Sequence, residues 1–337
     1  MISDFEHEYG SLDYSFYNAF CNSNYQVQTL YLKKPKILRI FEKKSFFYRF
    51  IYKLLNITFY FKFIFFLKIK FSTKKNFDLI FVLKGLNLSS YSIRELKKLD
   101  SKLISFNPDD PFNLISSSNS IKNNIKYFDH YFIWSKNLCK KIEKIYGIKT
   151  TFLPFAADPS IHKINKVKVQ KNPVITFIGN WDDEREKWLS KIDTKNCLKI
   201  YGFNWENNLK NKTLKSCLMG HSIHPKKFSA KVHQSQINLN ILRTQNKNAS
   251  NMRTYEIIIS GGFQLHEFSE EVAEIFIEGK EIEFFKSQDE LNEKISFYLK
   301  NPSICSSIAK AGFEKINSSN NFYTDRVRKI EKSIYDT

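Results

Sequence analysis

Residues 239–267 read LNILRTQNKNASNMRTYEIIISGGFQLHE, and this stretch decides the predicted fold. Its first part belongs to residues 237–242 (INLNIL), which have the length of a strand and place apolar residues at alternate positions. A polar loop follows, then an apolar segment at 252–260 with helical spacing, then a short apolar run at 263–265. Two strands joined by a helix form a βαβ unit, whose strands lie parallel in one sheet.

The same alternation of strand and helix extends in both directions along the chain. Apolar runs closed by Gly, Asn or Pro predict strands, and the amphipathic segments between them predict helices. We therefore expect an α/β protein with two Rossmann-like domains, residues 1–155 and 156–318, a ligand cleft between them, and a last helical segment at 319–337. The predicted strands cover residues 25–31, 77–83, 102–106, 131–134, 150–153, 173–178, 197–201, 237–242, 263–265 and 282–285.

Composition limits the possible classes of protein. The 337 residues are 42% apolar and 16% aromatic, enough for two buried cores, so a disordered or collagen-like chain is excluded. The five cysteines are far apart and none forms a C-x-x-C pair, which argues against a disulfide framework or zinc site and indicates a reducing cytoplasm. Lys and Arg number 53 against 34 Asp and Glu, a net charge of +19. This charge leaves open polyanion binding, membrane contact or a compositional bias.

Residues 46–71 are the most membrane-like segment. Basic residues interrupt the apolar ones throughout, so there is no uncharged run of about 18 residues, and the segment is not expected to span a bilayer. Two alternatives remain: a basic, aromatic helix that lies on an anionic membrane, or an amphipathic helix packed on its own domain. We expect a cytoplasmic protein and favour packing of 46–71 on its own domain over peripheral contact with the inner face of the membrane.

The predicted strand ends nominate candidate residues by position. In parallel α/β sheets, ligands bind beyond the carboxyl ends of the strands, where loops and helix N-termini converge. The residues at or just after the ends of predicted strands are Lys84, Gly85, Asn107, Pro108, Asp109, Asp110, Gly179, Asn180, Gly202 and Arg243.

The loop and helix at 248–262 hold the densest set of candidates. A helix that begins near Asn251 presents free backbone N–H groups, with Arg253 and Thr254 in its first turn, and this arrangement favours a phosphate. Glu256, one turn further, is suited to accept hydrogen bonds from a ribose diol. The same pattern also describes a capped helix with a solvated Arg and Glu, and the two interpretations are balanced.

Glycines mark two more candidate positions. Gly261 and Gly262 permit either close backbone approach or a helix stop. Gly179 and Asn180 end a predicted strand, and the helix that follows carries Arg185 in its first turn, which is a second anion-binding arrangement. Acidic residues at this helix start are equally typical of an ordinary helix N-terminus.

Asp109 and Asp110 lie between two prolines after a predicted strand. Paired carboxylates there are able to act as a base, bind a metal or hydrogen-bond a sugar hydroxyl, whereas the alternative is a rigid turn. The chain has no G-x-x-x-x-G-K-[ST], G-x-S-x-G, H-E-x-x-H or G-x-G-x-x-G motif. Their absence argues against a P-loop protein, a serine hydrolase, a zinc protease and a dehydrogenase.

In their order along the chain, these segments resemble the CgeB-like, or spore-maturation-type, glycosyltransferases of the GT-B superfamily (glycosyl transferases group 1). The resemblance covers about residues 77–330, and its most specific part is 239–267. The matching segments are FDLIFVLKG (77–85), SFNPDDP (105–111), LPFAADPSIH (153–162), FIGNWDDEREKWL (177–189), IYGFNW (200–205), the block 239–267, FIEGKEIEFFKSQDEL (276–291) and NPSICSSIAKAGFEKI (301–316).

The resemblance implies a GT-B fold, in which two Rossmann-like domains face each other across the cleft and the segment at 319–337 packs back on the first domain. It implies a retaining, hexosyltransferase-like enzyme that moves a sugar from a nucleotide-sugar donor to a glycan, lipid-linked or protein acceptor, in the synthesis of surface polysaccharide or glycoconjugate. Arginines and a helix N-terminus would stabilise the leaving diphosphate, so no metal or other cofactor is expected. No nucleic-acid partner is expected, because no DNA- or RNA-binding motif accompanies the charge.

The resemblance also assigns roles to residues. Arg185, Arg253 and Thr254 would hold the diphosphate, and Glu256 would hold the ribose, as the second glutamate of the E-x7-E motif does in related retaining transferases. Asp109 and Asp110 are the catalytic candidates, which would face the sugar or the acceptor from the opposite wall. The remaining donor-binding candidates are Gly179, Asn180, Arg243, Asn251, Gly261 and Gly262.

The chain departs from the family pattern at two places. Asn248 stands where E-x7-E has its first glutamate, which leaves the catalytic carboxylate unassigned and keeps a non-catalytic nucleotide-sugar- or glycan-binding protein as the alternative function. The first domain also lacks a recognisable first strand, because a polar segment follows Met1 almost directly. Either the true start lies upstream of Met1, or the first sheet is short of one strand.

Overall fold

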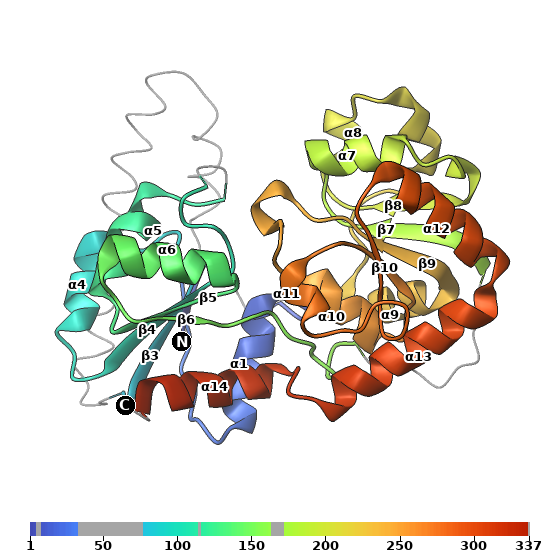
Figure 1. The fold of residues 1–337 in the computed structure, drawn as a ribbon. Coiled ribbons are helices and arrows are strands. Elements are labelled where there is room, and N and C mark those ends of the chain that lie inside the picture. Colours follow the sequence, from blue (N-terminus) through green and yellow to red (C-terminus); the bar gives the residue numbers. More distant parts are fainter. Residues whose placement is uncertain (5–7, 33–76, 114–115, 163–171, 336–337) are drawn as a thin grey trace, which may run out of the picture. The chain divides into compact units, whose positions relative to one another are not determined.

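The computed structural model of the chain describes residues 1–4, 8–32, 77–113, 116–162 and 172–335. They belong to two units, Met1–Leu153 with Ser333–Thr337 and Pro154–Lys332, each with its own sheet (Figure 1). The segment at 46–71 lies outside the described residues, so its helix and its membrane contact stay predictions. In the part of the chain that the structure describes, no helix combines the length and the apolar character needed to cross a membrane.

The first unit holds a six-stranded parallel sheet in the order β2-β1-β3-β4-β5-β6. Its strands are β1 (Ile2–Ser3), β2 (Leu30–Tyr31), β3 (Leu79–Leu83), β4 (Lys102–Asn107), β5 (His130–Ile133) and β6 (Thr150–Phe152). Its helices are α1 (Leu12–Asn22), α4 (Ser90–Lys97), α5 (Asn119–Asn124), the 3-10 turn η1 (Ile125–Tyr127) and α6 (Lys136–Tyr146). The Phe16 ring of α1 packs on Phe81 and Phe106, 5.1 and 5.2 Å between centroids, and so seals one part of the core.

The prediction of a missing first strand needs correction. Ile2 pairs with Val82 of β3 and with Leu30 of β2, and Ser3 pairs with the next residue of each, so β1 occupies the position between them. The strand escaped prediction because two residues are too few to show any apolar period. The predicted strand at 25–31 is likewise limited to Leu30–Tyr31.

The second unit holds a five-stranded parallel sheet in the order β11-β10-β9-β7-β8. Its strands are β7 (Asn172–Ile178), β8 (Leu198–Tyr201), β9 (Ser235–Asn240), β10 (Gln264–Glu267) and β11 (Glu283–Phe285). Its α-helices are α7 (Asp183–Ser190), α8 (Trp205–Asn208), α9 (Pro225–Gln234), α10 (Met252–Ile259), α11 (Glu270–Ala273), α12 (Gln288–Lys300) and α13 (Pro302–Ser318), with α14 (Tyr323–Tyr335) at the end. The 3-10 turns are η2 (Lys195–Cys197), η3 (Lys212–Cys217) and η4 (Thr244–Asn246).

Helices cover both faces of this second sheet, because successive side chains of a buried strand point to opposite faces. Ile175 of β7 belongs to a core cluster that includes Leu189 of α7 and residues of α12 and α13, such as Ile295. Ile178 of the same strand belongs to a second cluster, with residues of α9 and α10 that include Phe228. The strand order is that of a doubly wound sheet: from β7 the chain adds β8 on one side, and it then adds β9, β10 and β11 on the other. The switch point of the sheet therefore lies between β7 and β9.

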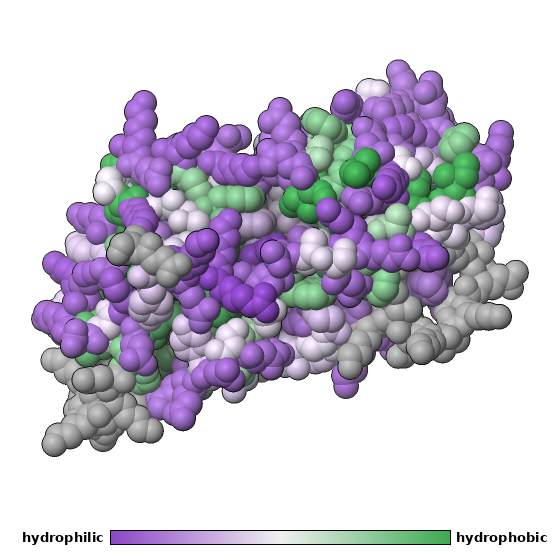
Figure 2. Space-filling view, turned by 60° about the horizontal axis from the view of Figure 1, so that its bottom comes forward, coloured by the Kyte–Doolittle hydropathy of each residue, from purple (hydrophilic) through white to green (hydrophobic). Residues whose placement is uncertain are grey.

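The surface of the described residues shows no single broad apolar patch on the face in Figure 2, where hydrophobic residues form small groups among hydrophilic ones. The exposed large hydrophobic residues are spread over both units: Tyr91, Ile145, Phe203, Met219, Ile277, Phe297, Ile304 and Tyr335. Scattered residues of this kind are normal for a folded protein in water.

Candidate functional site

The carboxyl ends of β7 and β8 are held together at two glycines. The Gly179 N–H donates to the Tyr201 carbonyl (2.9 Å), and the Gly179 carbonyl accepts from the Trp205 indole N–H (2.8 Å). A Cβ on Gly202 would overlap the Gly179 carbonyl. Glycine at position 202 therefore lets the two strand ends approach closely, at the edge where doubly wound sheets in general bind their ligands.

Arg185 bridges the ends of β7 and β9. Its Nε donates to the Ile241 carbonyl just after β9 (2.9 Å), and its Nη1 donates to the Asn180 carbonyl just after β7 (3.1 Å). The guanidinium lies over the Phe177 ring, 5.5 Å from the centroid, and only 8% of the residue is exposed. The predicted Arg185 and Asn180 thus lie together at the switch point of the sheet.

Three arginine charges influence one another at this edge. The pKa of the Arg185 guanidinium is lowered to about 9, mainly because burial disfavours its charge and further because Arg243 and Arg253 are near. Asp182 and Glu267 act in the opposite direction but do not cancel the effect. An anion bound here would relieve the excess positive charge, and a diphosphate has oxygens that match guanidinium groups.

Helix α10 begins with a capping box formed by Asn251 and Thr254. The Asn251 Oδ1 accepts from the Thr254 N–H (2.9 Å), and the Thr254 hydroxyl accepts from the Asn251 N–H (3.3 Å). Asn240, which ends β9, exchanges two side-chain hydrogen bonds with Asn251, and His266 Nε2 lies 3.0 Å from the Thr254 hydroxyl. Thr254 is fully buried. The protein itself satisfies this helix start, and contact of either side chain with a donor stays a prediction.

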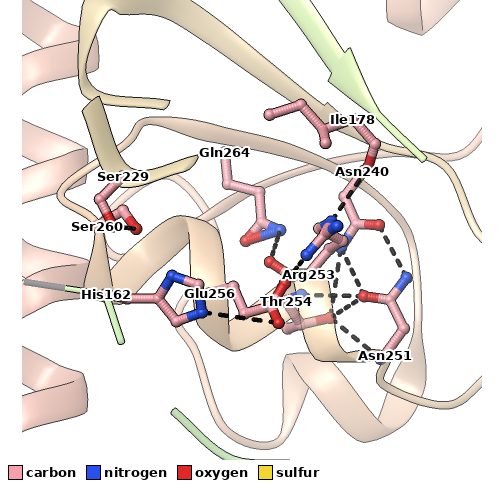
Figure 3. A network of polar contacts seen from close by, with 10 residues as sticks. All are labelled: His162, Ile178, Ser229, Asn240, Asn251, Arg253, Thr254, Glu256, Ser260 and Gln264. Atoms are coloured by element: carbon pink, nitrogen blue, oxygen red, sulfur yellow. Dashed lines mark hydrogen bonds and ion pairs between the residues drawn. The ribbon is translucent and has the colours of Figure 1, made fainter. Parts of the chain in front are cut away.

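Arg253 extends from the first turn of α10 and has three partners, of which Figure 3 draws Ile178 and Glu256. Its Nε donates to the Ile178 carbonyl (3.1 Å), its guanidinium lies over the Phe228 ring at 4.6 Å, and its Nη1 forms an ion pair with Glu256. The side chain is nevertheless 34% exposed. Arg253 therefore combines a fixed position with access to solvent, which is what an anion-binding arginine requires.

Glu256 is buried behind Arg253. Burial by itself would raise the pKa of its carboxyl, but the charge of Arg253 and the neighbouring His162 outweigh burial and lower it to about 2. The His162 Nε2 lies 3.7 Å from Glu256 Oε1, while Oε2 faces Arg253. Both carboxylate oxygens face partners within the second unit, and the prediction that Glu256 holds a ribose stays a prediction.

Gly261 and Gly262 lie at the other end of α10. Gly261 follows the helix in the left-handed region, with φ +69°. A Cβ on Gly262 would collide with Val232 and come within 2.8 Å of the Asn238 amide nitrogen. Since β10 begins at Gln264, both glycines stand at the amino edge of the sheet, opposite the edge where the arginines gather. The structure gives them a packing role and separates them from the other candidates.

In the first unit, Asp109 and Asp110 follow β4. The Asp109 carboxylate forms an ion pair with Lys84, which ends the neighbouring β3 (2.6 Å), and the two side chains are 21% and 18% exposed. The Asp110 Oδ1 accepts from the Phe112 N–H (2.8 Å), which stabilises the turn. The Lys84–Asp109 pair therefore remains accessible at the carboxyl edge of its sheet, and a catalytic role for either aspartate stays a prediction.

Two buried carboxylates at the same edge were not predicted. Asp4 accepts hydrogen bonds from the Leu86 N–H (2.6 Å) and the Asn87 N–H (2.9 Å), and burial raises its pKa. Burial also raises the pKa of Asp13, at the start of α1, to about 7. Their position follows from β1, so no signal for them exists until that two-residue strand is known.

His162 and Phe228 were also missing from the predicted site. The His162 ring packs edge-on against Phe228 at 5.1 Å, and the same aromatic ring contacts Arg253. His162 closes the LPFAADPSIH segment, so its place in an ordered motif was the available signal. Phe228 gave none, because an aromatic residue in an amphipathic helix is ordinarily a core residue.

No group of three or more His, Cys, Asp or Glu side chains within the described ranges is arranged to hold a metal ion. The described cysteines are all free thiols. Metal independence stays a prediction.

Residues 185–332 match a protein-family model described as glycosyl transferase-like. None of the curated proteins compared with the chain matches it significantly. The match covers the second unit from its first arginine to the last helix, and so includes the whole arginine cluster.

Several solved glycosyltransferase structures resemble the chain. T4 phage β-glucosyltransferase in complex with its UDP-glucose substrate is 13% identical, with a TM-score of 0.63 over 99% of this chain and 98% of that one. Sucrose-phosphate synthase from Thermosynechococcus elongatus is 10% identical, with a TM-score of 0.60 over 79% and 76%. S. aureus TarM in a complex that includes UDP is 11% identical, with a TM-score of 0.56 over 76% of this chain and 55% of TarM.

The chain thus spans about half the length of the TarM structures that it matches. Its two parallel α/β units and these neighbours confirm the predicted fold class, a two-domain GT-B fold. The family model adds that residues 185–332 of this fold are glycosyl transferase-like in sequence.

Proposed function

We propose that the chain is a CgeB-like glycosyltransferase that moves a sugar from a nucleotide-sugar donor to a glycan, lipid-linked or protein acceptor. We place it in the cytoplasm, in the synthesis of a cell-surface polysaccharide or glycoconjugate. One observation carries the proposal: Arg185, Arg243 and Arg253 gather at the switch point of a doubly wound sheet, where burial and mutual repulsion lower the pKa of Arg185.

The arginines suit the chemistry of the leaving group. When the bond between the anomeric carbon and the diphosphate oxygen breaks, negative charge develops on the diphosphate. The Ile241 carbonyl fixes Arg185 and the Ile178 carbonyl fixes Arg253, so neither guanidinium has to reorganise as that charge appears. We propose that transfer is metal-independent on this basis, because the arginines supply the positive charge.

On the acceptor side, the accessible Lys84–Asp109 pair is the proposed contact with the acceptor or the transferred sugar. We propose a hexosyl donor and retention of the anomeric configuration, as the resemblance to E-x7-E transferases implies. Donors of the UDP class are the first to test, since UDP or UDP-glucose is bound in neighbouring structures.

Arg253→Ala tests the proposed function most directly. Calorimetry measures the affinity of the wild-type chain for UDP-glucose, UDP-N-acetylglucosamine, GDP-mannose and ADP-glucose. For the donor that binds most tightly, the loss of a charge-assisted contact, about 1.5–3 kcal/mol, predicts a roughly 10- to 150-fold weaker Kd. The matched control is Arg328→Ala, because Arg328 is 68% exposed on α14, and its Kd should equal that of the wild type.

If no donor in the panel binds the wild-type chain, or if Arg253→Ala binds as tightly as Arg328→Ala, the proposed function or the site assignment is wrong. A second candidate function remains, a non-catalytic nucleotide-sugar- or glycan-binding protein. It is favoured by Asn248, which replaces the first glutamate of E-x7-E and has a left-handed backbone (φ 61°). Donor binding without release of the nucleoside diphosphate, across a panel of acceptors, would support it.

A further inference from the structure

Phe203 is an exposed aromatic residue at the carboxyl edge of the second sheet, and the proposed function does not yet use it. It comes directly after Gly202, which follows β8, and 49% of it is exposed. Its ring stacks on the ring of His221, which is also exposed, with 5.9 Å between the centroids and 24° between the planes. Since about half of Phe203 remains exposed, His221 covers only part of it. The two side chains form an aromatic platform that is open to solvent.

The backbone of Phe203 is fixed to the end of β7. Its N–H donates to the Asn180 Oδ1 (3.2 Å), and its carbonyl accepts from the Trp181 N–H (2.9 Å). The next residue, Asn204, has a left-handed backbone (φ 68°). A ring on a fixed backbone loses little conformational freedom when a ligand contacts it, so the platform is preorganised for binding.

Asn180 connects the aromatic platform with the arginine cluster. Its side chain accepts from the Phe203 N–H, and its carbonyl accepts from the Arg185 Nη1 (3.1 Å). A single residue therefore contacts both the backbone that carries the platform and an arginine that is proposed to hold the diphosphate.

The loop that carries His221 leads to the second arginine. Two residues after His221, Ile223 packs against the core cluster that contains Phe228. The Phe228 ring in turn lies under the Arg253 guanidinium, 4.6 Å from its centroid. The platform is thus linked to both Arg185 and Arg253 by direct contacts within the second unit.

We propose that Phe203 and His221 bind the base of the nucleotide-sugar donor by stacking. This inference rests on the proposed function, because it takes the diphosphate to lie at the arginines. β8 is the last strand in the order of its sheet, to one side of the switch point between β7 and β9 (Figure 1). The nucleoside stays on the leaving diphosphate, so this margin can hold it while the sugar remains open to an acceptor. Every base has a π face that an aromatic ring can stack on.

Phe203→Ala tests the proposal with three probes: the tightest donor of the panel above, the matching nucleoside diphosphate and inorganic pyrophosphate. Loss of one base–aromatic stack predicts a roughly 5- to 150-fold weaker Kd for the first two probes. The Kd for pyrophosphate should equal that of the wild type, because pyrophosphate has no base. The matched control is Phe297→Ala, because Phe297 on α12 is also 49% exposed, and its donor Kd should equal that of the wild type.

Two further variants separate stacking from general apolar contact. Phe203→Tyr keeps the π face and should bind the donor as the wild type does. Phe203→Leu keeps an apolar side chain without a π face, so it should bind the donor more weakly than Phe203→Tyr. Equal donor affinity in these two variants would contradict stacking.

The outcomes distinguish the role of Phe203 from the proposed function. Equal donor affinity in Phe203→Ala and Phe297→Ala overturns that role while the proposed function stands. A weaker Kd for pyrophosphate in Phe203→Ala also overturns it, because the substitution would then act through the arginines. A weaker Kd for the donor but not for the nucleoside diphosphate would show that the ring contacts the transferred sugar instead of the base. Absence of donor binding by the wild-type chain overturns both.

Discussion

Replacing Arg185 by methionine tests two opposing contributions of this side chain to stability: the cost of burying its charge and the gain from its hydrogen bonds. Burial and the neighbouring arginines lower its pKa from 12.5 to about 9. At about 1.36 kcal/mol per pKa unit, the charge costs the folded state on the order of 5 kcal/mol. This cost is fully present below about pH 9, where folded and unfolded chains both carry the charge, and it disappears as pH rises from 9 toward 12.5.

The hydrogen bonds of Arg185 offset most of that cost. It donates to the Ile241 and Asn180 carbonyls, and a charged donor contributes about 1.5–3 kcal/mol per bond. The two contributions nearly balance, so Arg185→Met should change the free energy of unfolding by only about 1–2 kcal/mol at neutral pH. Removing one partner of a buried ion pair, by comparison, costs about 3–5 kcal/mol, because the other charge is left uncompensated.

Donor binding should show the opposite sensitivity. A ligand at 100 times its Kd raises the stability of the native state by about 2.7 kcal/mol. If Arg185 holds the diphosphate, Arg185→Met weakens Kd roughly 10- to 150-fold, and the same ligand concentration then adds only about 0.3–1.4 kcal/mol. Urea unfolding with and without the tightest donor measures both quantities, with Arg328→Met as the exposed control.

The result that refutes this reasoning is a variant destabilised by more than about 3 kcal/mol that keeps the full increment from the donor. Arg185 would then be a structural bridge between β7 and β9, and the lowered pKa would mark a tolerated cost rather than a site prepared for an anion. An unchanged melting curve combined with a lost donor increment supports the assignment.

Glu256→Gln should remove a contribution to the free energy of unfolding that the wild type has at pH 7. The wild type loses this contribution as pH falls from about 4.5 toward 2, because the pKa of the Glu256 carboxyl is lowered to about 2. Thermal unfolding at a series of pH values measures the difference, and identical profiles for the two proteins would contradict it. Asp109→Asn should lower the free energy of unfolding by less than about 1 kcal/mol, since the ion pair of Asp109 with Lys84 is partly exposed. The same variant should lower the transfer rate at least about tenfold and leave the donor Kd unchanged. Initial rates with an identified acceptor test this, and a wild-type rate would show that Asp109 is not catalytic. Gly202→Ala should lower stability by about 1–3 kcal/mol, because its Cβ would overlap the Gly179 carbonyl; a melting temperature equal to the wild type would show that the strand ends can separate freely.

The sequence was sufficient for the architecture wherever a strand is long enough to show an apolar run. The apolar run at 77–83 and the alternating segment at 237–242 predicted strands that correspond to β3 and β9, which are central in their sheets. It was insufficient for β1, since two residues have no period and this strand is held by pairing with β2 and β3 on either side. The predicted strand at 25–31 contains β2, which is limited to Leu30–Tyr31 and pairs with β1. Tertiary pairing, rather than local preference, makes those residues strands.

The candidate site divides in the same way. The positions of Arg185 and Arg253 after strands were predictable, because the carboxyl edge of a parallel sheet is where such residues can act together. The contacts that Thr254 and Glu256 make within the protein were not predictable. Thr254 belongs to a capping box, and Glu256 contacts His162, which precedes it by 94 residues, and both contacts depend on how the elements pack. A pattern of residue types therefore locates the site but does not tell which side chains are held by the protein and which are left for a ligand.

The net charge of +19 and the arginine cluster have different physical consequences. Exposed lysines such as Lys187 and Lys210 are about two-thirds exposed even in their ion pairs, and salt at physiological strength screens such charges beyond about 8 Å. They attract polyanions of any kind and select none. Arg185 and Arg253 are fixed by backbone carbonyls at one sheet edge, where screening is weaker and an anion would meet charges that are already in place. On the proposed function, a preference for a diphosphate over other anions therefore comes from these few fixed charges, while the overall charge of the chain affects how it meets anionic surfaces in general.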